Sequence, residues 1–551
     1  MNGKRTGKWI TGKIRKRIPA LVVMTVSHVG SALLGVAFAL LCKNMIDFAL
    51  AKDTDRFLQA CLVQGLVIAG MLVCTVLYRH LHGRLAADID RDLKKDLFAR
   101  LLTGDYASVS GYHTGDLMNR LGQDVRAVHE GILGVVPNAA AMAAKLIAAI
   151  AVLAVLEPIF TVIVCAVGVL LLVLTGVLRP KIKAIHKQVS EQEGKVTGFL
   201  QETLEKLLMV QALDVAGQIQ ERADVLLVGR YRAQMKRKNV SLLTNTAVNF
   251  FVNIAGFAAL IWCAFGLFAG TLSVGGLTAV TQLVSQLQRP FIGMSGIFPQ
   301  YTAMLACAER LMELEEIEME DKPMTGLPQG ITAIGAQDLS FRYDRDTVFD
   351  AASFVMPTQG FVVVMGSSGI GKSTLLKLML GMLHPHTGHL YVEGVDGRTQ
   401  LGRATRRLFA YVPQGNLLLS GTLRENLTLV KPNATEEEIA QAIYVSAMDE
   451  YLPTLPQGLD TVVGENAAGL SEGQSQRLAI ARAVLGGAPI LLLDECTSAL
   501  DEATEKTVLE RLRNLEERTC IAVTHRPAAR EIADRTLMMA DGRITVGQTE
   551  K

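Results

Sequence analysis

Six long runs of apolar residues occupy the first part of the chain. They cover Ile18–Cys42, Phe57–Leu77, Ile132–Val155, Ile159–Leu178, Thr246–Phe268 and Leu277–Phe298. Each run is long enough for the ~20 residues that an α-helix needs to cross the ~30 Å hydrocarbon layer of a bilayer. Core helices of a soluble protein are the alternative, and six such runs argue against them. The pattern therefore predicts a membrane domain of six helices within residues 1–314.

Basic residues between the runs indicate how the helices are oriented. They gather after the second run, after the fourth and before the fifth, at Arg79, Arg84, Arg91, Lys94, Lys95, Arg179, Lys181, Lys183, Lys187, Arg230, Arg232, Lys236, Arg237 and Lys238. The opposite loops, such as Glu157–Pro158 and Ala269–Gly276, hold few basic residues. The positive-inside rule then places both termini in the cytoplasm of a multi-pass membrane protein. We expect a bacterial inner or plasma membrane.

The start of the chain is basic and contains one tryptophan. Residues 1–17 are rich in Lys and Arg, hold no acidic residue and include Trp9. Next to a membrane span, this composition indicates a cytoplasmic helix at the interface. A disordered basic tail is the alternative, since the segment also contains glycines. The following apolar run is too long for a cleavable signal peptide and lacks its small-residue site, so it is typical of a membrane anchor.

Two long segments separate the spans on the basic side. They cover roughly residues 78–131 and 179–245 and are rich in helix formers with charged faces. Because a helix of about 30 residues extends about 45 Å, each segment can form a helical hairpin that projects below the membrane. We expect both hairpins to contact the next domain.

The pattern changes after residue 314. Residues 315–330 contain Pro323, Gly326, Pro328 and Gly330, which break the helical run and predict a linker. From residue 331 to 551, short apolar runs alternate with helical patterns, which predicts an α/β domain.

Composition argues against a nucleic-acid-binding surface and against disulfide or metal-binding roles for the cysteines. Half of the residues are hydrophobic, 20% are charged and the net charge is only +2, so no basic footprint for nucleic acid is present. The eight cysteines form no CxxC pair, and most lie in apolar runs. We interpret them as buried thiols rather than disulfides or metal ligands.

A glycine-rich loop in the α/β part predicts a phosphate site. Gly366-x4-Gly371-Lys372-Ser373 follows the apolar run FVVVM and precedes a helical run, the context that this motif requires. Lys372 would bind the β- and γ-phosphates, and the Ser373 hydroxyl would ligate Mg²⁺. A glycine-rich turn with a chance lysine is the alternative. The residues assigned to ATP here are Gly366, Ser367, Ser368, Gly369, Gly371, Lys372, Ser373 and Thr374.

Two acids end another apolar run, ILLLDE. Paired carboxylates at the end of a buried strand are costly unless they serve a cation. Asp494 is positioned to hold Mg²⁺ through water, and Glu495 to polarise the attacking water. A strand that simply ends in surface acids is the alternative.

Between these motifs, Leu470–Gln474 reads LSEGQ and resembles the LSGGQ signature of the ABC transporter ATPase family, with Glu472 in place of a glycine. The resemblance implies that Ser471, Gly473 and Gln474, at the start of a helix, contact the γ-phosphate of ATP bound by another subunit. It therefore implies a dimer, either a homodimer or a heterodimer with a second half-transporter.

Other positions match family motifs in the family's order. The resemblance implies that Tyr343 stacks on adenine, that Gln414 contacts Mg²⁺ and water, that Asp501 belongs to the D-loop and that His525 contacts the γ-phosphate. Gly464–Glu465 resembles the loop that touches the membrane hairpins. Cys496 stands where the family usually has alanine.

The membrane part resembles the exporter-type fold of the same family. Tyr112–Leu117 with Arg120 and Asp124 resembles the end of the first cytoplasmic hairpin, and Ala306–Leu314 resembles the exit of the sixth helix. The implied activity is ATP hydrolysis coupled to transport, with Glu495, His525 and Gln414 as catalytic residues. ATP and Mg²⁺ are the implied cofactors, and membrane lipid and an unidentified substrate are the implied partners.

Three functions remain open on the sequence. The first is export or flipping of a lipid, peptide or drug-like molecule. The second is import of a siderophore-like metal chelate, and the third is a soluble ABC ATPase without transport. Polar residues in the apolar runs mark either a substrate pathway or hydrogen bonds between helices. They are His28, Lys145, Asn245, Asn249, Asn253, Gln282, Gln286 and Arg289.

Overall fold

The computed structural model describes residues 3–320, 326–343, 346–415, 418–464, 469–515 and 518–548, apart from some side chains within 167–190, 244–252 and 288–298. The chain forms two compact units. The membrane unit comprises residues 1–99 and 114–316, and the ATPase unit comprises residues 100–113 and 317–551. Residues 100–113, from the middle of the first long segment between the spans, therefore belong to the second unit.

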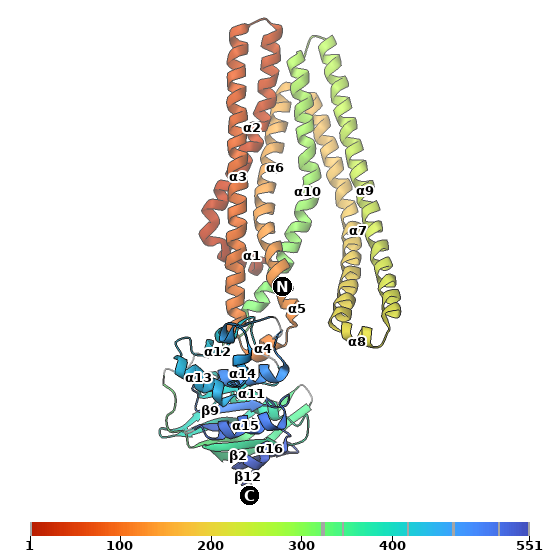
Figure 1. Ribbon diagram of the computed structural model, residues 1–551. Coiled ribbons are helices and arrows are strands. Elements are labelled where there is room, and N and C mark those ends of the chain that lie inside the picture. Colours follow the sequence, from red (N-terminus) through yellow and green to blue (C-terminus); the bar gives the residue numbers. More distant parts are fainter. Residues whose placement is uncertain are drawn as a thin grey trace. The chain divides into compact units, whose positions relative to one another are not determined.

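Long helices make up the membrane unit. They are α1 (Gly3–Ile14), α2 (Ile18–Leu50), α3 (Thr54–Thr103), α6 (Val125–Leu156), α7 (Pro158–Glu205), α9 (Ala216–Phe268) and α10 (Val274–Glu315). Two short helices, α5 (Thr114–Asn119) and α8 (Leu207–Ala212), and a π-helical turn at Arg120–Asp124 complete it. In Figure 1, α2, α3, α6 and α10 lie together, while α7 and α9 form a separate pair joined by α8.

Each predicted apolar run lies within one of these helices. Among the described residues, the segments Lys4–Leu50, Thr54–Thr103 and Thr114–Leu156 are long and apolar enough to cross a membrane, and Asn253–Phe268 is a shorter apolar helix. The helices also continue past the runs, so that α3 reaches Thr103 and α7 reaches Glu205. The two long segments between the spans are therefore helical, as predicted.

The basic start of the chain is a helix tied to its neighbours. Ile10 and Ile14 of α1 are buried. Lys13 forms ion pairs with Asp96 (3.0 Å) and Glu315 (2.6 Å), and Arg17 pairs with Asp88 at 2.9 Å. These pairs join α1 to α3 and α10, so an ordered helix is found here and not a disordered tail.

Helices α6 and α10 approach each other closely. A Cβ added at Gly131 of α6 would lie 2.5 Å from the Cβ of Met304 on α10, nearer than two side chains can pack. Asp124, whose exposed fraction is 2%, accepts hydrogen bonds from both Nε and Nη2 of Arg310. A small residue and an ion pair between the buried Asp124 carboxylate and Arg310 thus hold the two helices together.

The described residues of the ATPase unit form three sheets. A six-stranded sheet has the order β12-β11-β3-β10-β9-β6, a four-stranded antiparallel sheet has the order β2-β1-β4-β5, and β7 pairs with β8. The strands are β1 (Ala333–Tyr343), β2 (Asp346–Pro357), β3 (Gly360–Met365), β4 (Thr387–Gly394), β5 (Gly397–Gln400), β6 (Phe409–Val412), β7 (Gly421–Thr422), β8 (Val462–Val463), β9 (Ile490–Asp494), β10 (Thr519–Val523), β11 (Arg535–Ala540) and β12 (Arg543–Gln548). The α/β prediction is confirmed.

Helices complete this unit. They are α4 (Tyr106–Ser110), α11 (Lys372–Met379), α12 (Leu423–Thr428), α13 (Glu436–Val445), α14 (Glu472–Leu485), α15 (Glu502–Arg513) and α16 (Pro527–Ile532). The central strands β3, β9 and β10 are parallel and buried, which explains their unbroken apolar sequences. Val364, Val523 and Asp494 are aligned across them, so the loops that follow these strands meet at one edge of the sheet.

The eight cysteines were predicted to be buried, and the structure buries half of them. Cys263, Cys307, Cys496 and Cys520 are buried, and the other four are half-buried.

The close approach of α6 and α10 predicts the effect of a single methyl group. Gly131→Ala should lower the thermal unfolding midpoint in detergent, because overpacking costs typically about 1–3 kcal/mol. Gly83→Ala is the matched control, since Gly83 lies inside α3 with no atom within 4 Å of its added Cβ. The Gly83→Ala control should leave the stability unchanged or raise the free energy of unfolding by up to about 1 kcal/mol. Equal midpoints for the Gly131 variant and the parent would contradict the close-packing argument.

Candidate nucleotide-binding site

The phosphate loop joins β3 to α11 through glycines in the left-handed region. Gly366, Gly369 and Gly371 have φ angles of 155°, 79° and 108°. At Gly371, an added Cβ would also lie 2.2 Å from a methyl carbon of Val348. The positive φ and the close approach of Val348 both require glycine at this position. The resulting turn directs backbone N–H groups toward the start of α11, where the helix dipole favours anions.

Lys372 is held inside this loop. Its Nζ donates hydrogen bonds to the carbonyl oxygens of Gly366 (3.0 Å) and Ser367 (2.9 Å), and the residue is 6% exposed. Burial lowers the pKa of the ammonium, although Glu495 and Asp494 oppose the shift. A buried cation whose hydrogen bonds in the described structure go to neutral carbonyls is well suited to exchange them for phosphate oxygens.

Asp494 at the end of β9 faces the same loop. Ser373 Oγ donates to Asp494 Oδ1 at 3.0 Å, and the Tyr411 hydroxyl donates to Oδ2 at 3.2 Å. Burial raises the pKa of this carboxyl group, whose residue is 2% exposed. A carboxylate and a hydroxyl beside the phosphate loop fit Mg²⁺, which takes few protein ligands and keeps waters and phosphate oxygens.

Tyr411 was not among the sequence candidates. It lies on β6, aligned with Leu492 of β9, and its own pKa is raised by burial and by Asp494. Its position three residues before Gln414 was the available signal, but only strand pairing shows which acid it reaches.

The three predicted catalytic residues, Gln414, Glu495 and His525, lie close together. Gln414 Nε2 donates to Glu495 Oε2 at 2.6 Å, and His525 Nε2 lies 3.8 Å from Oε1. Glu495 adopts a φ of 50°, which is unusual for a residue with a side chain, while its N–H donates to Val523 O at 2.9 Å. Such strain is typical of residues whose orientation matters for function.

Tyr343 borders a pocket of about 470 Å³ beside the phosphate loop. Its side chain is partly exposed, and its hydroxyl lies 3.5 Å from Thr374 Oγ1. The lining residues are Tyr343, Asp346, Thr347, Val348, Gly369, Ile370, Gly371, Thr374, Asp541 and Gly542. An aromatic ring here can stack on a nucleobase, and Asp541 and Gly542, from the turn between β11 and β12, are additions to the sequence candidates.

The LSEGQ segment forms a different surface. Ser471 caps α14 by accepting from Gln474 N (3.2 Å), and the Gln474 side chain accepts in turn from Ser471 N (2.8 Å). An added Cβ at Gly473 would lie 2.9 Å from Ala499 O, so glycine permits close packing on the segment before Asp501. The exposed Glu472 lies in the first turn, where its charge suits the helix dipole but repels phosphate.

The remaining motif residues lie as follows. Asp501 caps α15 and accepts from Thr504 N at 2.9 Å, which lowers its pKa. Within the part of the chain that the structure describes, none of the hydrogen bonds of Ser471 or Gln474 reaches the phosphate loop. Glu465 lies outside the described residues.

The polar residues of the apolar runs have mixed positions. His28 stacks on Tyr78 with ring centroids 4.3 Å apart, and Gln286 donates to Gly35 O at 2.8 Å. Gln286 therefore serves a contact between helices. Asn249 and Asn253 are exposed, and Lys145 and Gln282 are half-buried. The side chains of Asn245 and Arg289 lie outside the described set.

Comparisons with known proteins cover both units. Residues 21–291 match the family model described as ABC transporter transmembrane region, and residues 349–498 match the one described as ABC transporter. The chain is 30% identical over 502 residues to the cyclolysin secretion/processing ATP-binding protein CyaB of Bordetella pertussis, covering 89% of this chain and 68% of that protein. It is 27% identical to the ATP-dependent lipid A-core flippase of Haemophilus influenzae, covering 95% and 90%.

A solved structure shares the fold. The structure of a bacterial Atm1-family ABC exporter with ATP bound superposes with a TM-score of 0.82 at 23% identity, covering 97% of this chain and 96% of that one. This confirms the predicted fold, a six-helix membrane domain followed by an ABC-type ATPase domain.

The surroundings of Asp494 predict a gain in stability when its charge is removed. A carboxyl group whose pKa is raised by folding begins to cost stability above its unfolded-state pKa, and the cost is complete above the raised pKa. Asp494→Asn should therefore raise the unfolding midpoint of the nucleotide-free protein at pH 7 by a few degrees, as expected for a gain of about 1 kcal/mol. It should also abolish Mg²⁺-dependent ATP hydrolysis.

The gain in unfolding midpoint of Asp494→Asn should shrink as the pH falls, because wild-type Asp494 then becomes protonated. Asp501→Asn is the matched control, because Asp501 is exposed and its pKa is lowered instead. A lower midpoint for Asp494→Asn at every pH would refute the electrostatic argument.

Proposed function

The chain belongs to the ABC transporter family, and on that premise we propose that it is an ATP-driven exporter or flippase for a lipid, a peptide or a drug-like molecule. The observation that carries the proposal is the presence, on one chain, of the family's membrane region and of a phosphate loop facing Asp494 and Glu495. The two named relatives support the outward direction, since one is named for secretion and the other for flipping lipid A-core. They do not favour the importer of a metal chelate. A soluble ABC ATPase is excluded by the membrane region.

We assign the chemistry of hydrolysis to the edge of the sheet. Tyr343 would stack on adenine, and the loop with Lys372 would hold the phosphates. Ser373 and Asp494 would hold Mg²⁺, with Gln414 nearby; the ion would neutralise charge on the phosphate oxygens. Glu495 accepts the proton of the attacking water as general base. His525, 3.8 Å from Glu495, is close enough to orient it and to contact the γ-phosphate.

A second copy of the chain completes this site in the proposed mechanism. Ser471, Gly473 and Gln474 form a helix start that needs an anionic partner, and within one chain their hydrogen bonds do not involve the phosphate loop of the described structure. The proposed site therefore pairs Lys372 of one protomer with Ser471 of the other. A complete set of motif residues on this chain favours a homodimer over a heterodimer.

Helix α8 supports the same arrangement. Around it, large apolar side chains are exposed at the tip of the α7–α9 hairpin, at Leu204, Leu207, Leu208, Met209 and Leu213, with Leu208 82% exposed. An apolar cluster at the tip of a projecting hairpin is costly in water and is typical of a protein interface. We propose that the ATPase unit of the second copy covers it, so that closure around ATP moves α7 and α9.

The orientation of the chain follows from its charges. We propose that both termini are cytoplasmic, because the basic helix α1 and the basic segments between the spans lie on one side under the positive-inside rule. A bacterial inner or plasma membrane accords with the bacterial origin of the two named relatives.

Transport in inside-out vesicles tests the function and its direction. With ATP, the parent should accumulate a fluorescent lipid or amphiphilic dye in vesicles of bacterial lipid, while an importer would release preloaded probe. Glu495→Gln should lose transport and slow hydrolysis by about 100-fold or more, since a general base contributes that much. It should still bind ATP and hold the dimer closed. Parent-like hydrolysis by this variant would refute the base assignment.

Mixed dimers test the shared site. Lys372→Ala and Ser471→Ala chains should each be inactive alone, because every site then lacks one half. Purified mixed dimers, selected with two tags, should regain ATPase activity, because one of their sites contains both native residues. A mixture of two Lys372→Ala chains with different tags is the control. If the mixed dimers stay inactive while the parent is active, the two-chain site is refuted.

A further inference from the structure

The residues that follow α10 are fastened to the ATPase unit. Gly104 and Met319 form an antiparallel bridge. Asp105 N donates to Glu318 O at 2.8 Å, and Glu320 N donates to Thr103 O at 3.2 Å. Residues 317–320, within the segment that the sequence predicts as a linker, thus pair as a short strand with the residues just after α3.

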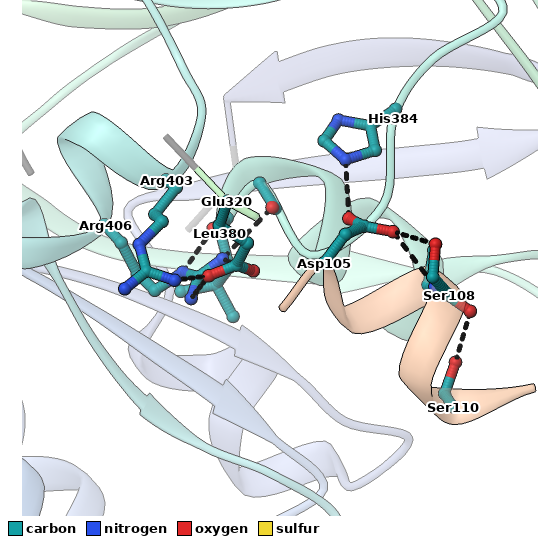
Figure 2. Close-up of polar contacts among 10 residues, drawn as sticks. Asp105, Ser108, Ser110, Glu320, Leu380, His384, Arg403 and Arg406 are labelled. Atoms are coloured by element: carbon teal, nitrogen blue, oxygen red, sulfur yellow. Dashed lines mark hydrogen bonds and ion pairs between the residues drawn. The ribbon is translucent and has the colours of Figure 1, made fainter. Parts of the chain in front are cut away.

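Glu320 ends this short strand with a buried carboxylate. The side chain is 6% exposed, and Figure 2 shows it beside Arg403 and Arg406. Arg406 donates through Nη2 to Oε1 at 2.9 Å and through Nη1 to Oε2 at 3.2 Å, and Arg403 donates to Oε2 as well. Charge-assisted bonds of this kind are the strongest that side chains make, and both oxygens of the carboxylate are used.

The arginines connect Glu320 to the helix that follows the phosphate loop. Arg406 Nε donates to Leu380 O at 2.9 Å, and its Nη2 donates to Gly381 O at 3.1 Å. Both carbonyls directly follow α11, whose first residues are Lys372 and Ser373. A continuous set of bonds therefore runs from the carboxyl end of the phosphate-loop helix to Glu320, in the segment that follows α10.

The short helix α4 joins the same cluster. Asp105 caps α4 by accepting from Ser108 N at 2.9 Å, and it also contacts His384 Nε2 at 2.9 Å (Figure 2). Burial alone would raise the pKa of Asp105, but the hydrogen bonds from His384 and Ser108 hold it below its usual value. His384 belongs to the loop after α11, so this loop contacts Asp105, two residues after α3, directly, and it is connected to Glu320 through Arg406.

We propose that Glu320 is a positioning residue that couples ATP hydrolysis to transport. It locks the segment between α10 and the ATPase unit onto Arg403 and Arg406, so that a shift of α11 on nucleotide binding moves α3 and α10 with it. Without the carboxylate, the segment would act as a flexible linker, and the ATPase unit would hydrolyse ATP without moving the helices. This inference rests on the proposed ATP-driven transport.

The test compares Glu320→Gln with Glu318→Gln in lipid vesicles. Glu318 is the matched control, because it lies two residues away in the same strand and is exposed. Glu320→Gln should keep the KM for ATP and the basal ATPase rate within about twofold, while molecules transported per ATP fall about tenfold, the scale expected from losing charge-assisted hydrogen bonds. Glu318→Gln should match the parent in all three.

A second variant separates coupling from folding. Arg403→Gln leaves the bonds of Arg406 in place and should uncouple more mildly, and Glu320→Gln combined with Arg403→Gln should be less than additive. Hydrogen exchange at the amides of Asp105 and Glu320 should speed up in Glu320→Gln and not in Glu318→Gln.

The outcomes are distinct. Full coupling in folded Glu320→Gln, or an equal loss of basal ATPase and transport in both Glu320→Gln and Arg403→Gln, would overturn the inference. A parent protein that hydrolyses ATP but moves no probe would overturn the proposed function instead.

Discussion

The parallel pairing of β3, β10 and β9 is the constraint on which the nucleotide site depends. Their register aligns Val364, Val523 and Asp494, so the phosphate loop, the Asp494–Glu495 pair and His525 all leave the sheet at one edge. Parallel strands need helical crossovers and bury both faces, which is why the strands read as unbroken apolar runs. Residues more than a hundred positions apart, such as Ser373 and Asp494, thereby come within hydrogen-bonding distance.

Three buried carboxylates illustrate how the molecule uses charge. Asp124 is paired with Arg310 and holds α6 to α10, while Glu320 is paired with Arg403 and Arg406 and anchors the segment after α10. Asp494 differs, since its hydrogen bonds in the described structure come from the hydroxyls of Ser373 and Tyr411. Burial without a cationic partner is unfavourable for an anion, so Asp494 is the acid of the three that a metal ion would stabilise most.

The boundary between the two units does not follow the boundary that composition indicates. Residues 100–113 lie between membrane helices in the sequence, yet they belong to the ATPase unit. Backbone pairing with residues 317–320 and the capped helix α4 explain this assignment. Because those contacts come from main-chain groups and short polar side chains, no hydrophobic periodicity in the sequence reveals them.

Sequence patterns alone predicted the six apolar helices, the α/β domain and the nucleotide motifs, because each depends on local periodicity or on residues close together in the chain. The resemblance carried by LSEGQ and its companion motifs identified the family before the fold was known. Tyr411, Asp541 and the Glu320 pair could not be predicted in this way, since their roles depend on which strands and loops are neighbours in space. Tertiary structure decided those contacts, because long-range strand pairing and the burial of charge are properties of the packed chain and of no single segment.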